Sequence, residues 1–368
     1  MNYFDKYNWA LMLNRNPVQN FNITEYHNLL CPKDDYPEFL PKYTRLPLLQ
    51  RLKGIGLLCG TDWTKLYKNR FYYSRFDHSV GVALIVWHFT HNKAQTIAGL
   101  LHDISTPTFS HVSDFRKGDA LTQTATEEPT ASIIRSDVQL QKMLELDGLT
   151  IGEVEDYHLY PIADNEIPRL SADRLEYMFP SGMSLDGSWT MEEVARCYKD
   201  IVILKNEDGI DELGFKHTEI AEEYCRHFCM IGHILQLNEN KLTLQLLGVI
   251  MNQAVELKIL SEQDFMKLSE QQVTGKIEFA INSNKNLPDS FANLYRTFRN
   301  MTFIEHTNKA LPPEDYFSVS LKVKQRYINP LVKDGVRLSS VSESAEKLIE
   351  DFLLYEDSKY GCVKIQKE

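Results

Sequence analysis

The chain has 368 residues, 43% of them hydrophobic, which is enough for one large or two ordinary globular domains. Its formal net charge of −11 argues against broad binding to nucleic-acid backbones, because that affinity depends on Lys and Arg neutralising phosphates. A few arginines inside one pocket would still suffice for a small anionic substrate. No apolar run approaches the length of a membrane span and no signal-peptide pattern is present, so we expect no membrane partner and a cytoplasmic location.

The first 45 residues are rich in Asn, Tyr and Pro, and we expect them to form an irregular lead-in. From Leu46 the run LPLLQRLKGIGLLCG places apolar residues at helical spacing, and Gly60 and Asp62 end the pattern. The regular part of the fold is therefore predicted to begin near residue 46.

The next stretch, from Arg75 to Asp114, concentrates histidines and aspartates on apolar segments. Its apolar runs at 79–90 and 94–102 predict two buried helices, with His78 at the start of the first and the His102-Asp103 pair at the end of the second. Two antiparallel helices would bring those ends within reach of one ion. A divalent cation would also give the adjacent His102 and Asp103 the shared partner that polar groups need in an apolar interior. The plainer alternative is two satisfied core histidines and an aspartate that caps a helix.

A histidine followed one helix later by a His-Asp pair resembles the signature of the HD-domain metal-dependent phosphohydrolases, which a distant aspartate completes. The segment PRLSADRLEYMF supplies Asp173 at the head of a helix-like run. The resemblance implies an HD-domain helical bundle in which His78, His102, Asp103 and Asp173 bind one divalent metal ion. Mixed nitrogen and oxygen ligands leave the choice among Mn, Fe, Co, Ni, Zn and Mg open.

Within this superfamily, residues 45–335 most resemble the dNTP triphosphohydrolase branch, through the QRLK run, the RFDHSVG string and the ADRLEY string. The resemblance implies that Arg75 and Arg174 bind substrate phosphate and that Tyr177 lies near the sugar. A guanidinium suits phosphate because it donates two parallel hydrogen bonds. The alternative for Arg75 is a surface salt bridge with Asp77 or another acid.

The loop ISTPTFSHVSDF resembles the branch's loop that ends in Phe-Ser-His and an aspartate. It implies that His111 and Asp114, and further along Glu127, handle protons or orient water. Glu127 has a second interpretation, since T-x-E-P also predicts a helix start with Thr126 as the N-cap. We favour the helix start, and the two roles are compatible.

Three positions depart from the branch. Leu57 stands where a sugar-contacting glutamine is expected, Thr106 stands where the loop would carry another histidine, and no histidine occurs near Thr126. Threonine donates a hydrogen bond to phosphate, so Thr106 is kept as a substrate contact, but it carries no charge and relays no proton near neutral pH.

Amphipathic patterns between about Glu192 and Asn300 predict successive helices, 316–330 alternates like strands, and the end of the chain predicts another amphipathic helix. We therefore expect a mostly α protein with a small β-containing C-terminal portion. The predicted domains are an irregular lead-in (1–45), a helical HD domain (46–300) and a mixed α/β portion (301–368).

Six cysteines without a paired framework fit a reducing compartment. Four residues invite a zinc interpretation: Cys225, His227, Cys229 and His233. Their segment, EEYCRHFCMIGHIL, is helical in pattern and lacks the spacing of common zinc modules, so we favour a helix without zinc.

These observations predict a metal-dependent phosphohydrolase that acts on a small phosphorylated substrate, with a nucleotide as the expected class, and that forms a homo-oligomer. Two alternatives stay open. One is a nucleotide-binding or regulatory protein with weakened catalysis, and the other is a phosphodiesterase.

Overall fold

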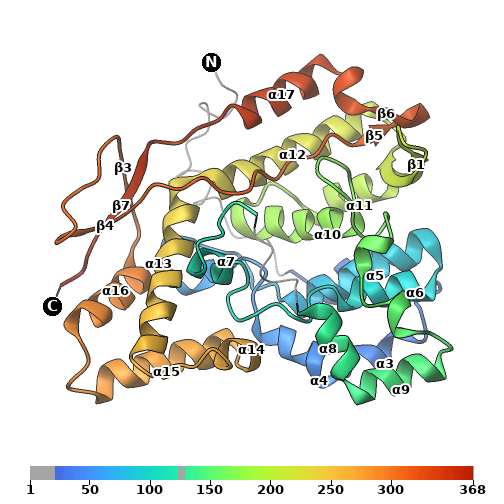
Figure 1. Cartoon of the computed structure of the whole chain (residues 1–368). Coiled ribbons are helices and arrows are strands. Elements are labelled where there is room, and N and C mark those ends of the chain that lie inside the picture. Colours follow the sequence, from blue (N-terminus) through green and yellow to red (C-terminus); the bar gives the residue numbers. More distant parts are fainter. Residues whose placement is uncertain (1–20, 123–128, 368) are drawn as a thin grey trace.

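Helices dominate the computed structural model, which describes residues 21–122 and 129–367, so the expectation of a mostly α protein is confirmed (Figure 1). Helix α5 lies at the centre of the first half, with α2, α6 and α10 packed against it. The helices of the first half are α2 (Ile23–Leu30), α3 (Leu40–Thr44), α4 (Pro47–Gln50), α5 (Arg75–Thr90), α6 (Lys93–Leu101), α7 (Val112–Arg116), α8 (Thr130–Ser136) and α9 (Val138–Leu146).

The second half is built on two long consecutive helices, α12 and α13, each of 19 residues. Helix α13 packs against α7 and α16, and α12 packs against α17 near the C-terminus. The helices of this half are α10 (Ala172–Ser181), α11 (Met191–Lys199), α12 (Thr218–Gln236), α13 (Asn238–Glu256), α14 (Asp264–Lys267), α15 (Glu270–Ser283), α16 (Asp289–Asn300) and α17 (Glu343–Leu353).

Short 3-10 and π segments connect several of these helices. The 3-10 segments are η2 (Arg51–Gly54), η3 (Thr61–Trp63), η4 (Ile151–Glu153), η5 (Tyr157–Leu159), η7 (Lys333–Gly335) and η8 (Leu338–Ser340). The π segment η6 (Gly182–Asp186) continues α10. The expected start near residue 46 corresponds to the short pair α4 and η2.

Two small sheets lie at the periphery of the helical body (Figure 1). The first has the order β1-β2-β5-β6, in which only the β2–β5 pair is parallel, and the second has the order β3-β7-β4 and is antiparallel. The strands are β1 (Ile201–Lys205), β2 (Asp211–Phe215), β3 (Glu305–Thr307), β4 (Tyr316–Val319), β5 (Leu331–Val332), β6 (Val336–Arg337) and β7 (Tyr360–Lys364). The expected small β portion at the C-terminal end is present.

The β1–β2 hairpin corrects the prediction that residues from about Glu192 to Asn300 form only successive helices. Helix α11 ends at Lys199, and the β-branched run that follows forms β1, paired with β2 from Ile201 opposite Phe215. Branched side chains favour strands over helices. The turn between the two strands contains Gly209, whose φ of 73° suits glycine.

The irregular lead-in was wrong for residues 40–44, which form α3, and for residues 23–30, which form α2. Asn22 caps this helix by accepting hydrogen bonds from the backbone N–H groups of Thr24 and Glu25. Tyr26 and Leu30 are fully buried against the core. A capped helix of eight residues with two buried side chains is stable when tertiary packing holds it.

The segment 316–330 forms a strand only over β4. Between β4 and β5 the chain has no regular structure and runs along α12 (Figure 1). The apolar residues of this irregular segment are used to cover the helical body, since Val323 and Ile328 are buried against it. Among the described residues, no helix is both long enough and apolar enough to cross a bilayer.

Candidate metal centre

His78 is placed by the first turn of α5. Ser74 caps the helix by accepting from the backbone N–H of Asp77, and the Asp77 side chain accepts in return from the Ser74 N–H, which forms a capping box. The helix is buried through most of its length, and His78 is 2% exposed. The cap fixes where the helix begins, and therefore which side of it carries His78.

His102 and Asp103 follow the last turn of α6, where His102 is the C-cap residue. Helices α5 and α6 pack closely together, as expected from the sequence. Gly99 permits this approach, because a side chain there would meet Val82 and Val86 of α5. The end of α6 is thereby held beside the start of α5.

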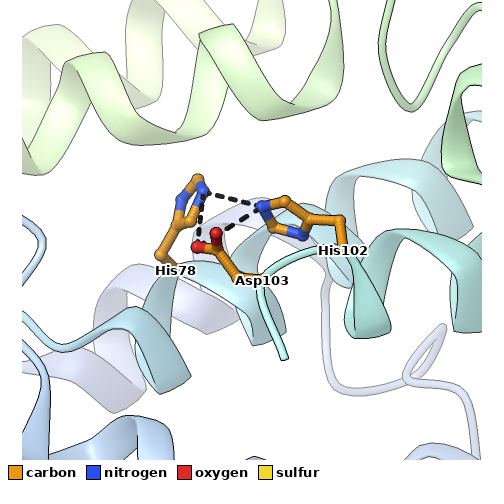
Figure 2. Close-up of side chains that lie close together, drawn as sticks. All are labelled: His78, His102 and Asp103. Carbon is orange, nitrogen blue, oxygen red and sulfur yellow. Dashed lines mark hydrogen bonds and ion pairs between the residues drawn. The ribbon is translucent and has the colours of Figure 1, made fainter. Parts of the chain in front are cut away.

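The side chains of His78, His102 and Asp103 point toward one another (Figure 2). The Nε2 atoms of the two imidazoles are 3.2 Å apart. Oδ2 of Asp103 lies 3.9 Å from Nε2 of His78 and 3.6 Å from Nε2 of His102. All three residues are buried, so this polar group has few ways to be solvated.

Asp173 lies beside the same two imidazoles. Its Oδ1 is 3.0 Å from Nε2 of His78 and 3.7 Å from Nε2 of His102. Helix α10, capped by Ser171, carries it against α5. The four residues expected to bind metal are therefore brought together, although 70 residues separate Asp103 from Asp173 along the chain.

Glu176 orients His78, and the sequence interpretation gave this residue no role. Its Oε2 accepts a hydrogen bond from Nδ1 of His78 at 2.5 Å, and the glutamate is fully buried. Gly81 makes room for it, because a Cβ at that position would overlap the carboxylate of Glu176. Its spacing of three residues from Asp173 on one helix was the available clue.

The two Nε2 atoms face one another because both Nδ1 atoms are already engaged. Nδ1 of His102 donates to the carbonyl oxygen of Gly99 at 2.7 Å, and Nδ1 of His78 donates to Glu176. In neutral imidazoles, this leaves a lone pair on each Nε2. A cation between the two nitrogens and the two carboxylates would satisfy all four groups; without one, a protonated His78 donates from Nε2 to Asp173. The donor set thus fits a divalent metal ion.

The surrounding charges favour a cation at this point. Burial lowers the pKa of His78, but Glu176 and Asp173 outweigh it and raise the pKa to about 10. Burial raises the pKa of Asp103, but Arg75 and the two histidines bring it well below its ordinary value. Burial likewise opposes ionisation of Asp173, and His78 lowers its pKa overall. Both carboxylates are ionised at neutral pH.

A cavity of about 210 Å³ opens at this centre. All four expected ligands line it, as do the expected substrate contacts Arg75, Thr106, Arg174 and Tyr177, and His111. Leu57, at the position of the expected glutamine, also lines the cavity and offers only apolar surface. The cavity therefore collects nearly every residue selected from the sequence.

Arg75 and Thr106 hold Asp103 in this structure. Nη1 of Arg75 donates to both carboxylate oxygens at 3.0 and 2.8 Å, and its Nε donates to Ser110 at 2.9 Å. The hydroxyl of Thr106 donates to Oδ1 of Asp103 at 2.8 Å. The salt bridge foreseen as the alternative for Arg75 exists, but it is buried and its partner is Asp103 rather than Asp77.

Arg174 is bound to its own neighbourhood. Its Nη1 lies 3.2 Å from Asp164, its Nε donates to the carbonyl of Arg169, and its Nη2 donates to Asn165. The guanidinium thus ties α10 to the loop that precedes it. Its expected contact with phosphate stays a prediction.

His111 and Asp114 form a dyad at the start of α7. Oδ2 of Asp114 accepts from Nδ1 of His111 at 3.0 Å, so Nε2 is the ring atom able to accept a proton. Burial lowers the pKa of His111, the hydrogen bond to Asp114 opposes this, and the charges of Arg326 and Arg75 lower the pKa again, so that it stays below its ordinary value overall. The imidazole is therefore neutral at pH 7, as a proton acceptor must be.

Two expectations fall partly or wholly outside the described residues. Glu127 and Thr126 lie in the segment 123–128, so neither the proton-handling role nor the N-cap is described. Helix α8 begins at Thr130, which follows that segment closely.

The structure does not support the zinc interpretation, because the groups among the described residues that could hold a metal ion include neither Cys225 nor Cys229.

Arg326 and Lys324 also line the cavity and had no role in the sequence interpretation. They lie on the irregular chain between β4 and β5, which had been predicted as strand. The alternating apolar residues there did not indicate that Lys324 and Arg326 would reach a site whose other residues lie much earlier in the chain.

Comparison with known proteins gives relatives of two kinds. The chain is 25% identical over 336 residues to the uncharacterized protein YdhJ of Bacillus subtilis. The aligned region covers 87% of this chain and 92% of YdhJ. It is 29% identical over 148 residues to the metal-dependent phosphohydrolase cns2 of Cordyceps militaris, which covers 40% of this chain and 41% of cns2. No family model matches the chain.

Solved structures share the fold. A phosphohydrolase from Bacteroides thetaiotaomicron superposes with a TM-score of 0.58 at 14% identity, over 92% of this chain and 97% of its own. A hypothetical protein from Aquifex aeolicus gives the same score and identity over 90% and 93%. These structures share the fold of this chain, and cns2 is named a metal-dependent phosphohydrolase. None of the four names mentions a deoxynucleoside triphosphate.

Proposed function

We propose that this chain is a metal-dependent phosphohydrolase of the HD type that hydrolyses a phosphate ester. The observation that carries the proposal is the pair of facing Nε2 atoms of His78 and His102, 3.2 Å apart, with Asp103 and Asp173 beside them. These four residues would hold one divalent ion, whose identity the donor set leaves open. A nucleotide is the first substrate class to test.

A divalent ion bound there would polarise a phosphate oxygen and lower the pKa of a water molecule. The chain's own residues supply the rest. Arg75 and Thr106 hold Asp103 in place, and Glu176 holds His78. His111, kept neutral and oriented by Asp114, would accept a proton at Nε2. Within this proposal, dNTP triphosphohydrolysis, homo-oligomeric assembly and a cytoplasmic location stay predictions.

The alternative is a regulatory protein that binds metal and nucleotide without turnover. Thr106 favours this alternative. It stands where a catalytic-loop histidine is expected, and its hydroxyl donates a hydrogen bond to Asp103. A metal-loaded protein that binds nucleotides and hydrolyses none of a broad phosphate panel would support this alternative over the first.

Metal analysis of the purified protein, followed by a screen of nucleoside mono-, di- and triphosphates, tests the proposal. The product should be identified as phosphate, pyrophosphate or triphosphate. The double variant His102→Ala, Asp103→Ala should lose bound metal and hydrolysis together, whereas His91→Ala, an exposed histidine at the C-cap of α5, should keep both. Hydrolysis that survives loss of the metal contradicts the proposal.

A further inference from the structure

Phe109 and Ser110 are two consecutive residues with left-handed backbone conformations, at φ of 65° and 54°. This region suits glycine, and a residue with a side chain is held there only at a cost in free energy. Both residues are fully buried. Such strain persists where the surrounding structure enforces it, and it is concentrated at functional sites. The turn formed by these two residues is therefore a place to look for a further role.

Contacts with remote parts of the chain enforce the turn. The backbone N–H of Thr108 donates to the carbonyl of Phe265 at 2.7 Å, and its hydroxyl donates to the carbonyl of Leu268 at 2.6 Å. Gly60 leaves room for the ring of Phe109, because a Cβ at that position would lie 3.1 Å from it. The turn is thus anchored on both sides of Phe109, and the position of Ser110 follows from it.

The turn places the hydroxyl of Ser110 against the guanidinium of Arg75. Oγ of Ser110 accepts from Nε of Arg75 at 2.9 Å and donates to the carbonyl oxygen of Gly56 at 3.3 Å. The bond to Gly56 uses the single proton of the hydroxyl, so its lone pairs are left for Nε. The peptide of Gly56 is fixed in turn, because its N–H donates to Glu270 at 3.0 Å. The hydroxyl is therefore oriented to act as an acceptor toward Arg75.

Fixing Nε also fixes the direction of the other N–H groups of Arg75, because the guanidinium is planar and rigid. Nη1 donates to both oxygens of Asp103, at 3.0 and 2.8 Å. Nη2 donates to no group among the residues that the structure describes. Arg75 lines the cavity, whereas Ser110 lies outside its lining. With Nε and Nη1 engaged, Nη2 is the nitrogen left for a ligand in the cavity.

We infer that Ser110 is a positioning residue, whose hydroxyl holds Arg75 so that Nη1 pairs with Asp103 while Nη2 is presented to the phosphate group of the substrate. This inference rests on the proposed function and deepens it. Without the hydroxyl, the guanidinium is free to turn until two of its nitrogens pair with the two oxygens of Asp103, the geometry that arginine and carboxylate favour. The donor for phosphate would then be lost, and the metal ligand Asp103 would stay in place.

Titration of the metal-loaded protein with inorganic phosphate tests this role without requiring turnover. We expect Ser110→Ala to bind phosphate about tenfold more weakly, because a hydrogen bond from a charged group is lost, and to bind the metal as tightly as the native chain does. Ser110→Gly should show the same loss of phosphate affinity, although it should melt at a higher temperature than Ser110→Ala, since glycine adopts the left-handed conformation readily.

The matched control is Ser113→Ala. Ser113 is a buried serine of α7, three residues further on, and its side chain makes no hydrogen bond to another described residue. This variant should bind phosphate as the native chain does. If Ser110→Ala and Ser110→Gly lose metal affinity as strongly as phosphate affinity, the hydroxyl has a merely structural role and the inference is overturned.

A double-mutant cycle separates the action of Ser110 through Arg75 from a direct one. In Arg75→Lys there is no Nε to orient, so adding Ser110→Ala should cause little further loss of phosphate affinity. Losses that multiply in the double variant overturn the inference, as does native phosphate affinity in both Ser110 variants or no phosphate binding by the native chain. Failure of the native metal-loaded chain to hydrolyse any phosphate ester, with phosphate still bound, overturns the proposed function instead.

Discussion

Oε2 of Glu176 accepts a hydrogen bond from Nδ1 of His78 at 2.5 Å, and both side chains are buried. Glu176 also accepts from the hydroxyl of Tyr73 at 2.5 Å through its other oxygen. The glutamate is therefore fixed at both oxygens and in turn fixes the imidazole ring. A carboxylate behind a metal-binding histidine sets its tautomer and raises its basicity.

Replacing Glu176 with Gln should weaken metal binding. Loss of such an orienting carboxylate typically costs about 10- to 100-fold in metal affinity, and we expect an effect of that size in a competition titration with a chelating dye. Glu145→Gln, on the exposed face of α9, is the matched control and should bind metal as the native chain does. Native affinity in Glu176→Gln would show that His78 is oriented by other contacts.

Thr106→Val removes the hydroxyl that donates to Asp103 and keeps the size of the side chain. We expect weaker metal binding by roughly tenfold, corresponding to about 1.4 kcal/mol for one hydrogen bond to a charged group. Thr106→Ser retains the hydroxyl and should restore most of the affinity. Equal metal affinity in the Val and Ser variants would mean that Arg75 alone holds Asp103.

The buried side chain of Glu270 predicts that the folded protein becomes less stable as pH rises through the mildly acidic range. It is buried, and burial raises its pKa to about 7 although Trp63 and the backbone N–H of Gly56 donate to it. The folded chain therefore holds a proton that the unfolded chain releases near pH 4.5, so this contribution to stability falls as pH rises from about 4.5 to about 7. Melting curves of Glu270→Gln should show a flatter dependence over this range. A parallel dependence in variant and native chain would contradict the assignment.

His306 predicts a loss of stability at alkaline pH. It lies between Glu239 and Asp357, at 2.9 and 3.0 Å, and joins β3 to α13 and to the chain before β7. Hydrogen bonds to Asp357 and Glu239 raise its pKa to about 10, from an ordinary 6.5. Its contribution is thus complete below about pH 6.5 and is lost as pH rises through about 10.

Melting temperatures from pH 6 to 10.5 test the role of His306. His306→Gln should lower the melting temperature at pH 6 and converge on the native value at the alkaline end, because the native imidazole is then neutral as well. His91→Gln, a more exposed histidine paired with Asp35, serves as the control for a general effect of removing an imidazole. A constant difference between His306→Gln and the native chain at all pH values would contradict an ionic contribution.

Local patterns in the chain were sufficient to predict the helices that carry the proposed metal ligands. The apolar runs after His78 and before His102 predicted α5 and α6, and the string around Asp173 predicted α10. A buried helix can be predicted in this way because its own residues must be apolar where they face the core. The hairpin β1–β2 and the helix α2 were missed, since each is short and is decided by its packing against distant parts of the chain.

The sequence by itself determined the types of the proposed ligand residues, their order along the chain and the helices that carry them. Only the tertiary structure decided that Arg75 faces Asp103, that Glu176 faces His78, and that the chain between β4 and β5 carries Arg326 to the cavity. The physical reason is that a residue's type and the period of its element are local properties. The partner of a buried charge is whichever group the packing of remote elements brings within a few ångströms.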